Sequence, residues 1–221
     1  MASRFYFPLT EAAPVTPPAP GAEWEHVNGV TRKLLTSPDT SALTTTAYTA
    51  DGADDLTNKD ACHHSYVSDG LAAQLISGNV KAQVQVVEAS TTNNLSLTIK
   101  IDVIRADGSV VRQTILAITR DGTEANNSIR NLGFNSVALT NYTCVAGDRL
   151  NVEIGLGGTP SAGAGTDAHN GSIRWGCSAA GGDLPENDTD TGTTLRGWIE
   201  FSNTIALNPA PHAMHYARLR R

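Results

Sequence analysis

Hydrophobic and polar residues alternate along much of the chain between residues 27 and 201. Successive side chains of a β-strand point to opposite faces, so this alternation predicts half-buried strands with one face in a core. The pattern is clearest over residues 95–103, where five Leu, Ile and Val residues share one face and Ser, Thr, Lys and Asp share the other. Residues 80–86 and 150–156 repeat it. No segment shows the spacing of a helical stripe.

Turn residues separate the alternating segments. Asp107 and Gly108 follow the clearest strand and supply the positive φ angles of a hairpin turn, so residues 110–118 are predicted to return antiparallel. Gly78 with Asn79, and Gly147 with Asp148, mark further turns. Weaker strands are predicted over residues 32–35, 43–49, 71–77, 129–139, 172–177 and 197–203.

About ten short strands with turns every 8 to 12 residues are typical of a sandwich or a barrel. The composition agrees, because the chain has 20 Gly, 10 Pro and only 17% charged residues. We therefore predict an all-β fold, an antiparallel β-sandwich of jelly-roll type. An immunoglobulin-like sandwich is the alternative.

The chain divides into three parts. Residues 1–25 contain five prolines and are predicted to form an extended N-terminal arm, residues 26–204 the sandwich, and residues 205–221 a basic C-terminal tail. The arm carries four large side chains that favour a groove over water, either on this subunit or on a neighbour. These predicted anchors are Phe5, Tyr6, Phe7 and Trp24.

The charge balance and the apolar segments narrow the range of partners. Sixteen Lys and Arg against 22 Asp and Glu give a net charge of −6, which argues against a nucleic-acid partner. No apolar run approaches the ~20 residues that span a bilayer, and none resembles a signal sequence. We expect a soluble chain that is made in a cytosol and has no membrane partner.

One loop carries a candidate metal site. Four carboxylates lie within eight residues, and oxygen ligands of this kind can surround Ca²⁺. The spacing does not match an EF-hand loop, and a solvated acidic turn is the commoner outcome. These weak candidate ligands are Asp183, Glu186, Asp188 and Asp190.

Other reactive residues give no catalytic pattern. Cys62, His63 and His64 lack a second pair that would complete a zinc site, so we predict one buried, hydrogen-bonded histidine and one exposed histidine. No serine stands in a G-x-S-x-G motif. The sequence therefore predicts no enzyme and no cofactor.

The cysteines and tryptophans are predicted to be structural. Three cysteines at wide spacing favour buried thiols, and three scattered tryptophans favour a core role over a platform for stacking sugars. The residues concerned are Cys62, Cys144, Cys177, Trp24, Trp175 and Trp198.

Several motifs together resemble a group of small bacteriophage and prophage virion proteins over most of residues 3–203. They are RFYFP at residues 4–8, AGDRLNVEIG at residues 146–155, GGDLPENDTDT at residues 181–191 and RGWIEF at residues 196–201. The similar proteins open with an R-F-Y-L/F-P arm, and they close with D-L-P-E-x-x-T-x-T before a W-x-E-F strand. Residues 214–221 have no counterpart in this pattern.

The resemblance implies a structural part of a tailed-phage virion, either a decoration or cement protein of the capsid or a component of the tail. The partners would be the major capsid protein or tail subunits, together with further copies of the chain, a trimer being favoured. The alternative is a module of a tail fibre that binds host-surface glycan through loops at residues 157–170 and 179–194. An enzyme acting on polysaccharide ranks last.

Overall fold

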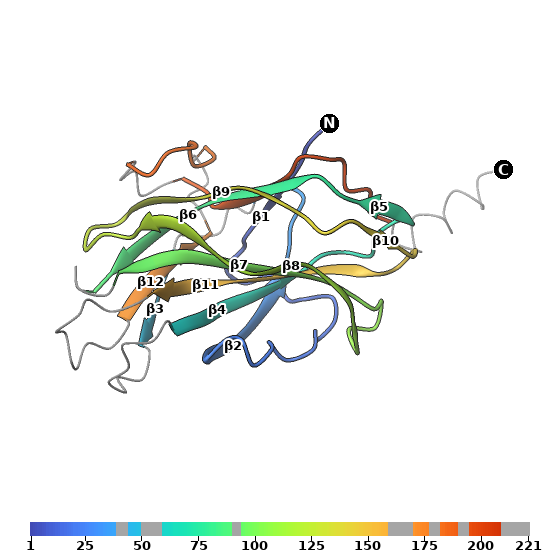
Figure 1. The fold of residues 1–221 in the computed structure, drawn as a ribbon, viewed down its shortest axis with the longest axis horizontal. Coiled ribbons are helices and arrows are strands. Elements are labelled where there is room, and N and C mark those ends of the chain that lie inside the picture. Colours follow the sequence, from blue (N-terminus) through green and yellow to red (C-terminus); the bar gives the residue numbers. More distant parts are fainter. Residues whose placement is uncertain are drawn as a thin grey trace.

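The chain folds as an all-β sandwich in the computed structural model, which describes residues 1–38, 44–49, 59–89, 94–158, 170–176, 182–189 and 195–208. These residues form thirteen strands and no helix (Figure 1). In particular, they contain no helix with the length and hydropathy needed to cross a membrane. The predicted fold class is confirmed.

Two large sheets and a short ribbon make up the fold. The six-stranded sheet has the order β1 (Ser3–Tyr6), β13 (Trp198–Phe201), β6 (Asn79–Glu88), β12 (Asn170–Trp175) and β3 (Thr44–Thr49), and β9 (Arg130–Ala138) also pairs with β6. The five-stranded sheet has the order β2 (His26–Lys33), β4 (Lys59–Val67), β11 (Arg149–Gly158), β7 (Leu95–Ile104) and β8 (Val111–Glu124). The ribbon consists of β5 (Gln74–Ile76) and β10 (Tyr142–Cys144).

The strongly alternating segments all form strands at or near their predicted positions, as β6, β7, β8 and β11. The weaker segments correspond to β2, β3, β5, β9, β12 and β13, although β2 begins at His26, six residues before its predicted start. Strands β1, β4 and β10 were not predicted. Strand β2 pairs with β4 in parallel, unlike the other strand pairs of the described residues.

The hairpin between β7 and β8 is confirmed, but its turn differs from the predicted one. The Gly108 amide donates to the Arg105 carbonyl at 2.9 Å, and Gly108 has a φ of 80°. Asp107 has a negative φ, and its carboxylate accepts a hydrogen bond from the Ser109 amide at 3.0 Å. One residue in the left-handed region is therefore enough to reverse the chain.

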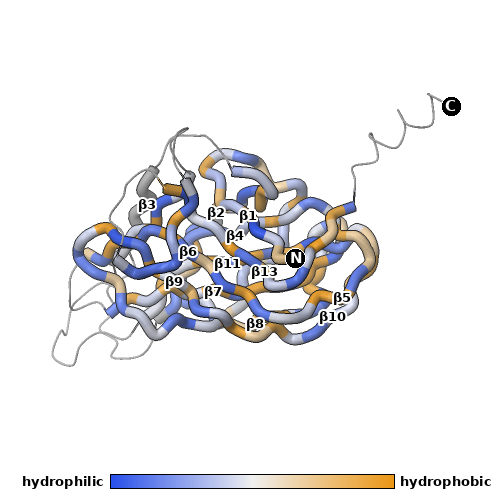
Figure 2. Tube along the Cα trace, turned by 90° about the horizontal axis from the view of Figure 1, so that it is seen from above, coloured by the Kyte–Doolittle hydropathy of each residue, from blue (hydrophilic) through white to orange (hydrophobic). Residues whose placement is uncertain are grey.

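The core lies between the two sheets, where hydrophobic and hydrophilic positions alternate along the strands (Figure 2). The inward faces of β6, β7 and β11 supply most of its aliphatic side chains. The outward faces of β7 and β11 were predicted to be solvated, but they are buried as well: Thr98, Asp102, Asn151 and Glu153 are all at most 1% exposed. A further layer of chain must cover this polar face.

A glycine permits the close approach of β11 to β4. The register shifts between Ile154 and Gly155, so that His64 and Cys62 are their partners and His63 is the additional residue of a bulge. A Cβ atom on Gly155 would collide with the carbonyl oxygen of Ala61. The side chain at this position must therefore be a hydrogen atom.

We predict that Gly155→Ala lowers the free energy of unfolding by about 3 kcal/mol, because the two central backbones must separate. The matched control is Gly122→Ala in β8, where an added Cβ meets no atom of the described part of the chain within 4 Å. That change should stay within about 0.5 kcal/mol of the wild type. Urea unfolding monitored by tryptophan fluorescence measures both values, and equal costs would contradict the proposed packing.

Candidate functional site

The N-terminal arm is docked on its own subunit. Strand β1 pairs antiparallel with β13 at the edge of the six-stranded sheet, with Arg4 opposite Glu200 and Phe5 opposite Ile199. Phe5 and Phe7 point into the core and are 1% and 3% exposed, whereas Arg4 and Tyr6 lie on the outer face. The period-two alternation of the arm therefore divides it into a core face and a contact face.

The contact face forms a cluster of charged and aromatic groups that we call the arm latch. It consists of Arg4, Tyr6, Asp183, Trp198 and Glu200. The Arg4 guanidinium donates to Asp183 Oδ2 at 2.9 Å and to Glu200 Oε2 at 2.9 Å, and its carbon lies 3.9 Å from the centre of the Trp198 ring. The Tyr6 hydroxyl donates to the same Asp183 oxygen at 3.1 Å.

The latch is partly shielded from water. The side chains of Arg4 and Asp183 are each 28% exposed, so a single ion pair contributes little by itself. Burial would raise the pKa of Glu200, but hydrogen bonds from Lys81 and Arg4 outweigh it and hold that pKa below its usual value. Stacking of Arg4 on Trp198 adds a cation–π contact, so the latch acts as a network.

Phe7 extends the arm into an aromatic cluster at the core. Its ring centre lies 4.9 Å from that of Tyr66 and 5.9 Å from that of Trp175, and His64 lies 4.6 Å from Trp175. Offset and edge contacts of this kind add to the stability that simple burial provides. The arm is therefore part of the hydrophobic core and not a separate appendage.

The end of the arm covers the polar outer face of the five-stranded sheet. The Trp24 indole donates to Glu153 Oε2 at 2.6 Å, and the Glu23 carboxylate lies 2.7 Å from Lys100 Nζ. Lys100 Nζ also lies 3.1 Å from Asp102 and 3.8 Å from Glu153. We call Lys100, Asp102 and Glu153, which are buried, together with the more exposed Glu23, the arm-covered charge cluster.

Three carboxylates share one ammonium group in this cluster. Burial raises the pKa of Glu153, although Lys100 and the Trp24 indole oppose the shift. Burial would lower the pKa of Lys100, but its carboxylate partners hold it above the usual value. Lys100 is therefore charged and compensates a negative site that is shielded from solvent. This lysine lies on the face that the sequence predicted to be solvated.

The proline-rich middle of the arm lies over β2 and β4. A hollow of about 360 Å³ separates Thr16 to Pro20 from Cys62, His63 and His64. Both histidines are buried, at 0% and 3% exposed, so the prediction of one exposed histidine was wrong. Burial lowers the pKa of His63 to about 3 and that of His64 to about 4, and it raises the pKa of Cys62 to about 12. All three groups are neutral near pH 7.

The predicted acidic ligands are engaged separately where the structure describes them. Asp183 belongs to the latch, and Glu186 accepts a hydrogen bond from Lys81 at 2.7 Å. Asp188 accepts a hydrogen bond from the backbone amide of Gly133 at 2.8 Å. Asp190 lies outside the described residues. Within the described ranges, no three His, Cys, Asp or Glu residues gather at a metal-binding distance.

The other predicted structural residues are buried. Trp24, Trp175 and Trp198 are at most 4% exposed, which removes them as sugar-stacking platforms. Cys62 and Cys144 are buried free thiols, as predicted. Cys177, the loop at residues 159–169 and the basic tail at residues 209–221 lie outside the described residues. Residues 205–208 are described, and there Ile205 is buried and Leu207 bridges to Leu71.

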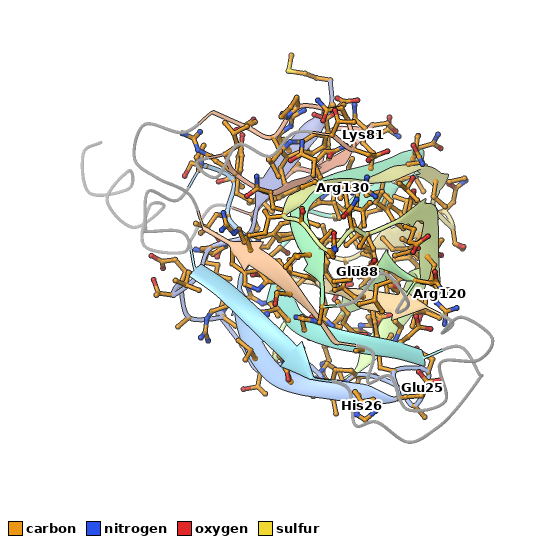
Figure 3. All side chains as sticks on the ribbon, turned by 90° about the vertical axis from the view of Figure 1, so that its left-hand side faces the viewer. Glu25, His26, Lys81, Glu88, Arg120 and Arg130 are labelled. Carbon is orange, nitrogen blue, oxygen red and sulfur yellow. The ribbon has the colours of Figure 1, made fainter. Side chains whose placement is uncertain are left out.

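The predicted anchors Phe5, Tyr6, Phe7 and Trp24 all contact the body of their own subunit, and their role in assembly stays a prediction. Sequence reasoning missed Arg4, although its alternation with Phe5 places it beside Tyr6. It also missed Lys100 and Glu153, because a polar face that another segment covers has the same pattern as a solvated one. Figure 3 shows Lys81, which pairs with Glu200 of the latch, at the opposite end of the view from Glu25 and His26, the two residues that follow Trp24.

Comparisons with known proteins assign no family. No family model matches the chain, and no curated protein matches it. The chain is 11% identical to a CocE/NonD family hydrolase from Staphylococcus aureus at a TM-score of 0.46, over 93% of this chain and 36% of that one. It is 12% identical to the VP2 subviral particle of infectious bursal disease virus at a TM-score of 0.27, over 84% and 50%. It thus spans about a third of the hydrolase and half of the capsid protein, and such scores support no inference about function.

We predict that Lys100→Met lowers the free energy of unfolding by about 3–5 kcal/mol at pH 7, because it leaves buried carboxylates without their cation. Without Lys100, the folded-state pKa of Glu153 should rise further above its unfolded value. The loss in free energy of unfolding relative to the wild type therefore has its full value above that folded-state pKa. The loss becomes smaller as the pH falls through that pKa. Urea unfolding of both proteins at about pH 7 and pH 5 tests this.

The control for Lys100→Met is Lys33→Met, which breaks a surface pair with Asp69 whose side chains are 30% and 45% exposed. It should cost at most about 1 kcal/mol at either pH. A Lys100→Met deficit that does not depend on pH would show that lost packing, and not charge, is its cause.

We also predict that the arm stabilises the domain. Phe7→Ala should cost about 3–5 kcal/mol, because it leaves a cavity between Tyr66 and Trp175. Tyr6→Phe removes one hydroxyl from the latch and should cost about 1 kcal/mol. Thermal unfolding followed by circular dichroism gives both values. A Phe7→Ala cost below that of Tyr6→Phe would mean that the arm is undocked in solution.

Proposed function

We propose that this chain is a structural protein of a tailed-phage virion that acts through contacts between subunits and not as an enzyme. It would decorate or cement the capsid or form part of the tail, with other virion proteins and further copies of itself as partners. The observation that carries the proposal is the arm latch, which joins residues from three of the motifs that resemble virion proteins.

The motifs are distant in sequence and meet in space. Arg4 belongs to RFYFP, Asp183 to the acidic motif and Glu200 to the final strand motif. Asp183 lies 179 positions from Arg4 in the sequence, and Glu200 lies 196 positions from it. A shared contact gives one reason for the three motifs to occur together. The acidic motif and the final strand motif form the surface that receives the arm motif.

This surface can receive the arm of another copy equally well. The contacts of β1 are backbone hydrogen bonds to β13, the latch and two buried phenylalanines, and none of them requires that arm and body belong to the same chain. Exchange of an identical element between subunits is a low-cost route to closed oligomers. In a symmetric assembly, every arm would gain in trans the contacts that it has in cis.

The buried titratable groups support an architectural role. Glu153 is covered by Trp24, and His63 and His64 lie beneath the proline-rich part of the arm. A general acid or base must reach its substrate within hydrogen-bonding distance. In this proposal Glu153 is a fixed part of the surface on which the arm docks, and His63 and His64 line the hollow beneath the arm.

A pair of cysteines tests arm exchange directly. Arg4 and Glu200 are opposite each other in an antiparallel pair, and opposite Cα atoms in such pairs lie about 4.5–5.5 Å apart, which a disulfide can span. We predict that the double variant Arg4→Cys, Glu200→Cys forms covalent multimers on oxidation, visible on a non-reducing gel. Purified phage particles should contain the same cross-linked species.

The single variant Arg4→Cys controls for cross-links to the native cysteines. A double variant that yields only internally linked monomers would exclude arm exchange, and light scattering would then show whether the subunits associate in another way. Absence of the chain from purified particles by mass spectrometry would exclude the virion role itself.

A further inference from the structure

A polar pocket of about 270 Å³ lies on the outer face of the six-stranded sheet, next to the latch. Its floor is formed by β6 and β9, and the described loop at residues 182–189 forms one wall. Gly133 creates part of the space, since a Cβ atom there would lie 2.7 Å from Gln83 Nε2 and 3.1 Å from Asp188 Oδ1. The volume is close to the ~300 Å³ lower end for small-molecule sites.

A buried acceptor in the pocket lacks a donor. Gln83 is 6% exposed and lines the pocket, and its Oε1 has no hydrogen-bond partner among the residues that the structure describes. An unpaired buried oxygen of this kind costs stability, so proteins rarely retain one without a reason. A ligand that offers an O–H or N–H group would satisfy it.

The charges on the walls favour a neutral ligand. Lys81 contributes a positive charge and Glu186 and Asp188 contribute negative charges, all on the same lining. Lys81 lies 2.7 Å from Glu186 and 3.2 Å from Glu200, so its charge is matched within the protein. An anion would meet the carboxylates and a cation would meet the ammonium group. A ligand that both donates and accepts hydrogen bonds fits all of these groups.

A hydroxyl group has both properties, and several hydroxyl groups on one small ring suit a lining of amide, carboxylate and ammonium side chains. Asn135, Ser136 and Asn187 complete this lining. The Trp198 ring is fully buried beneath Arg4 and is not open for stacking, so binding would rest on hydrogen bonds and be weak.

We propose that this pocket binds a single neutral sugar residue, with Gln83 Oε1 accepting a hydrogen bond from one of its hydroxyl groups. The loop that forms its wall belongs to the segment at residues 179–194 that sequence analysis associated with glycan. The proposal does not depend on arm exchange. A virion protein with such a site would gain a weak contact to surface carbohydrate, which many copies in one particle would strengthen.

The test is an NMR titration of the full chain with methyl glycosides of glucose, galactose, mannose and N-acetylglucosamine, each at up to about 50 mM. We expect at least one probe to shift the amide signals of Gln83 and Gly133. Gln83→Met should weaken that binding at least tenfold without lowering the melting temperature, because it removes an unpaired acceptor. Gly133→Ser should also abolish binding by filling the pocket.

The matched control is Gln85→Met, which makes the same chemical change on the same strand outside the pocket lining. Binding should persist in this variant. The proposal is overturned if no probe shifts these signals, or if binding survives Gln83→Met. Tighter binding of inorganic phosphate or methylammonium at the same residues would show that the pocket binds an ion and not a neutral sugar.

Discussion

Coverage of the outer face of β7 and β11 by the N-terminal arm is the contact on which the rest of the structure depends. This face carries Lys100, Asp102 and Glu153, whose charges are expensive to remove from water. The arm donates a hydrogen bond from the Trp24 indole to Glu153, and it places the Glu23 carboxylate beside Lys100. Without the arm, the five-stranded sheet would have one solvated face. With it, the central strands are covered on both sides.

The same segment connects the two sheets. It begins as β1 at the edge of the six-stranded sheet, inserts Phe7 between Tyr66 and Trp175, and then continues over β2 and β4 to Trp24. The arm therefore closes one side of the sandwich with apolar contacts and covers the other sheet with polar ones. An element with both kinds of contact holds its subunit together, and it would do the same for a neighbour if it crossed to one.

The latch and the polar pocket lined by Gln83 share a boundary, and this has a physical consequence. Lys81 lines the pocket and also pairs with Glu200, which accepts a hydrogen bond from Arg4. A change in the docking of the arm would alter the charge balance at the pocket wall. Binding of a ligand and position of the arm are then expected to influence each other through Lys81 and Glu200, and any such coupling must be reciprocal.

The sequence by itself determined the fold class and the strongest strands, since alternation over residues 80–86, 95–103 and 150–156 leaves one way to bury their aliphatic faces. It also placed Phe5, Phe7 and Trp24 out of water, because large apolar side chains avoid it. Only the tertiary structure decided which polar residues are buried, which carboxylates belong to the latch, and where Gly133 leaves a pocket. These outcomes depend on segments nearly 200 positions apart, such as Arg4 and Glu200, and local pattern holds no information about such distant neighbours. A lysine on a strand has the same sequence pattern whether water or another segment of the chain covers it, and the path of the arm decides which of the two it meets.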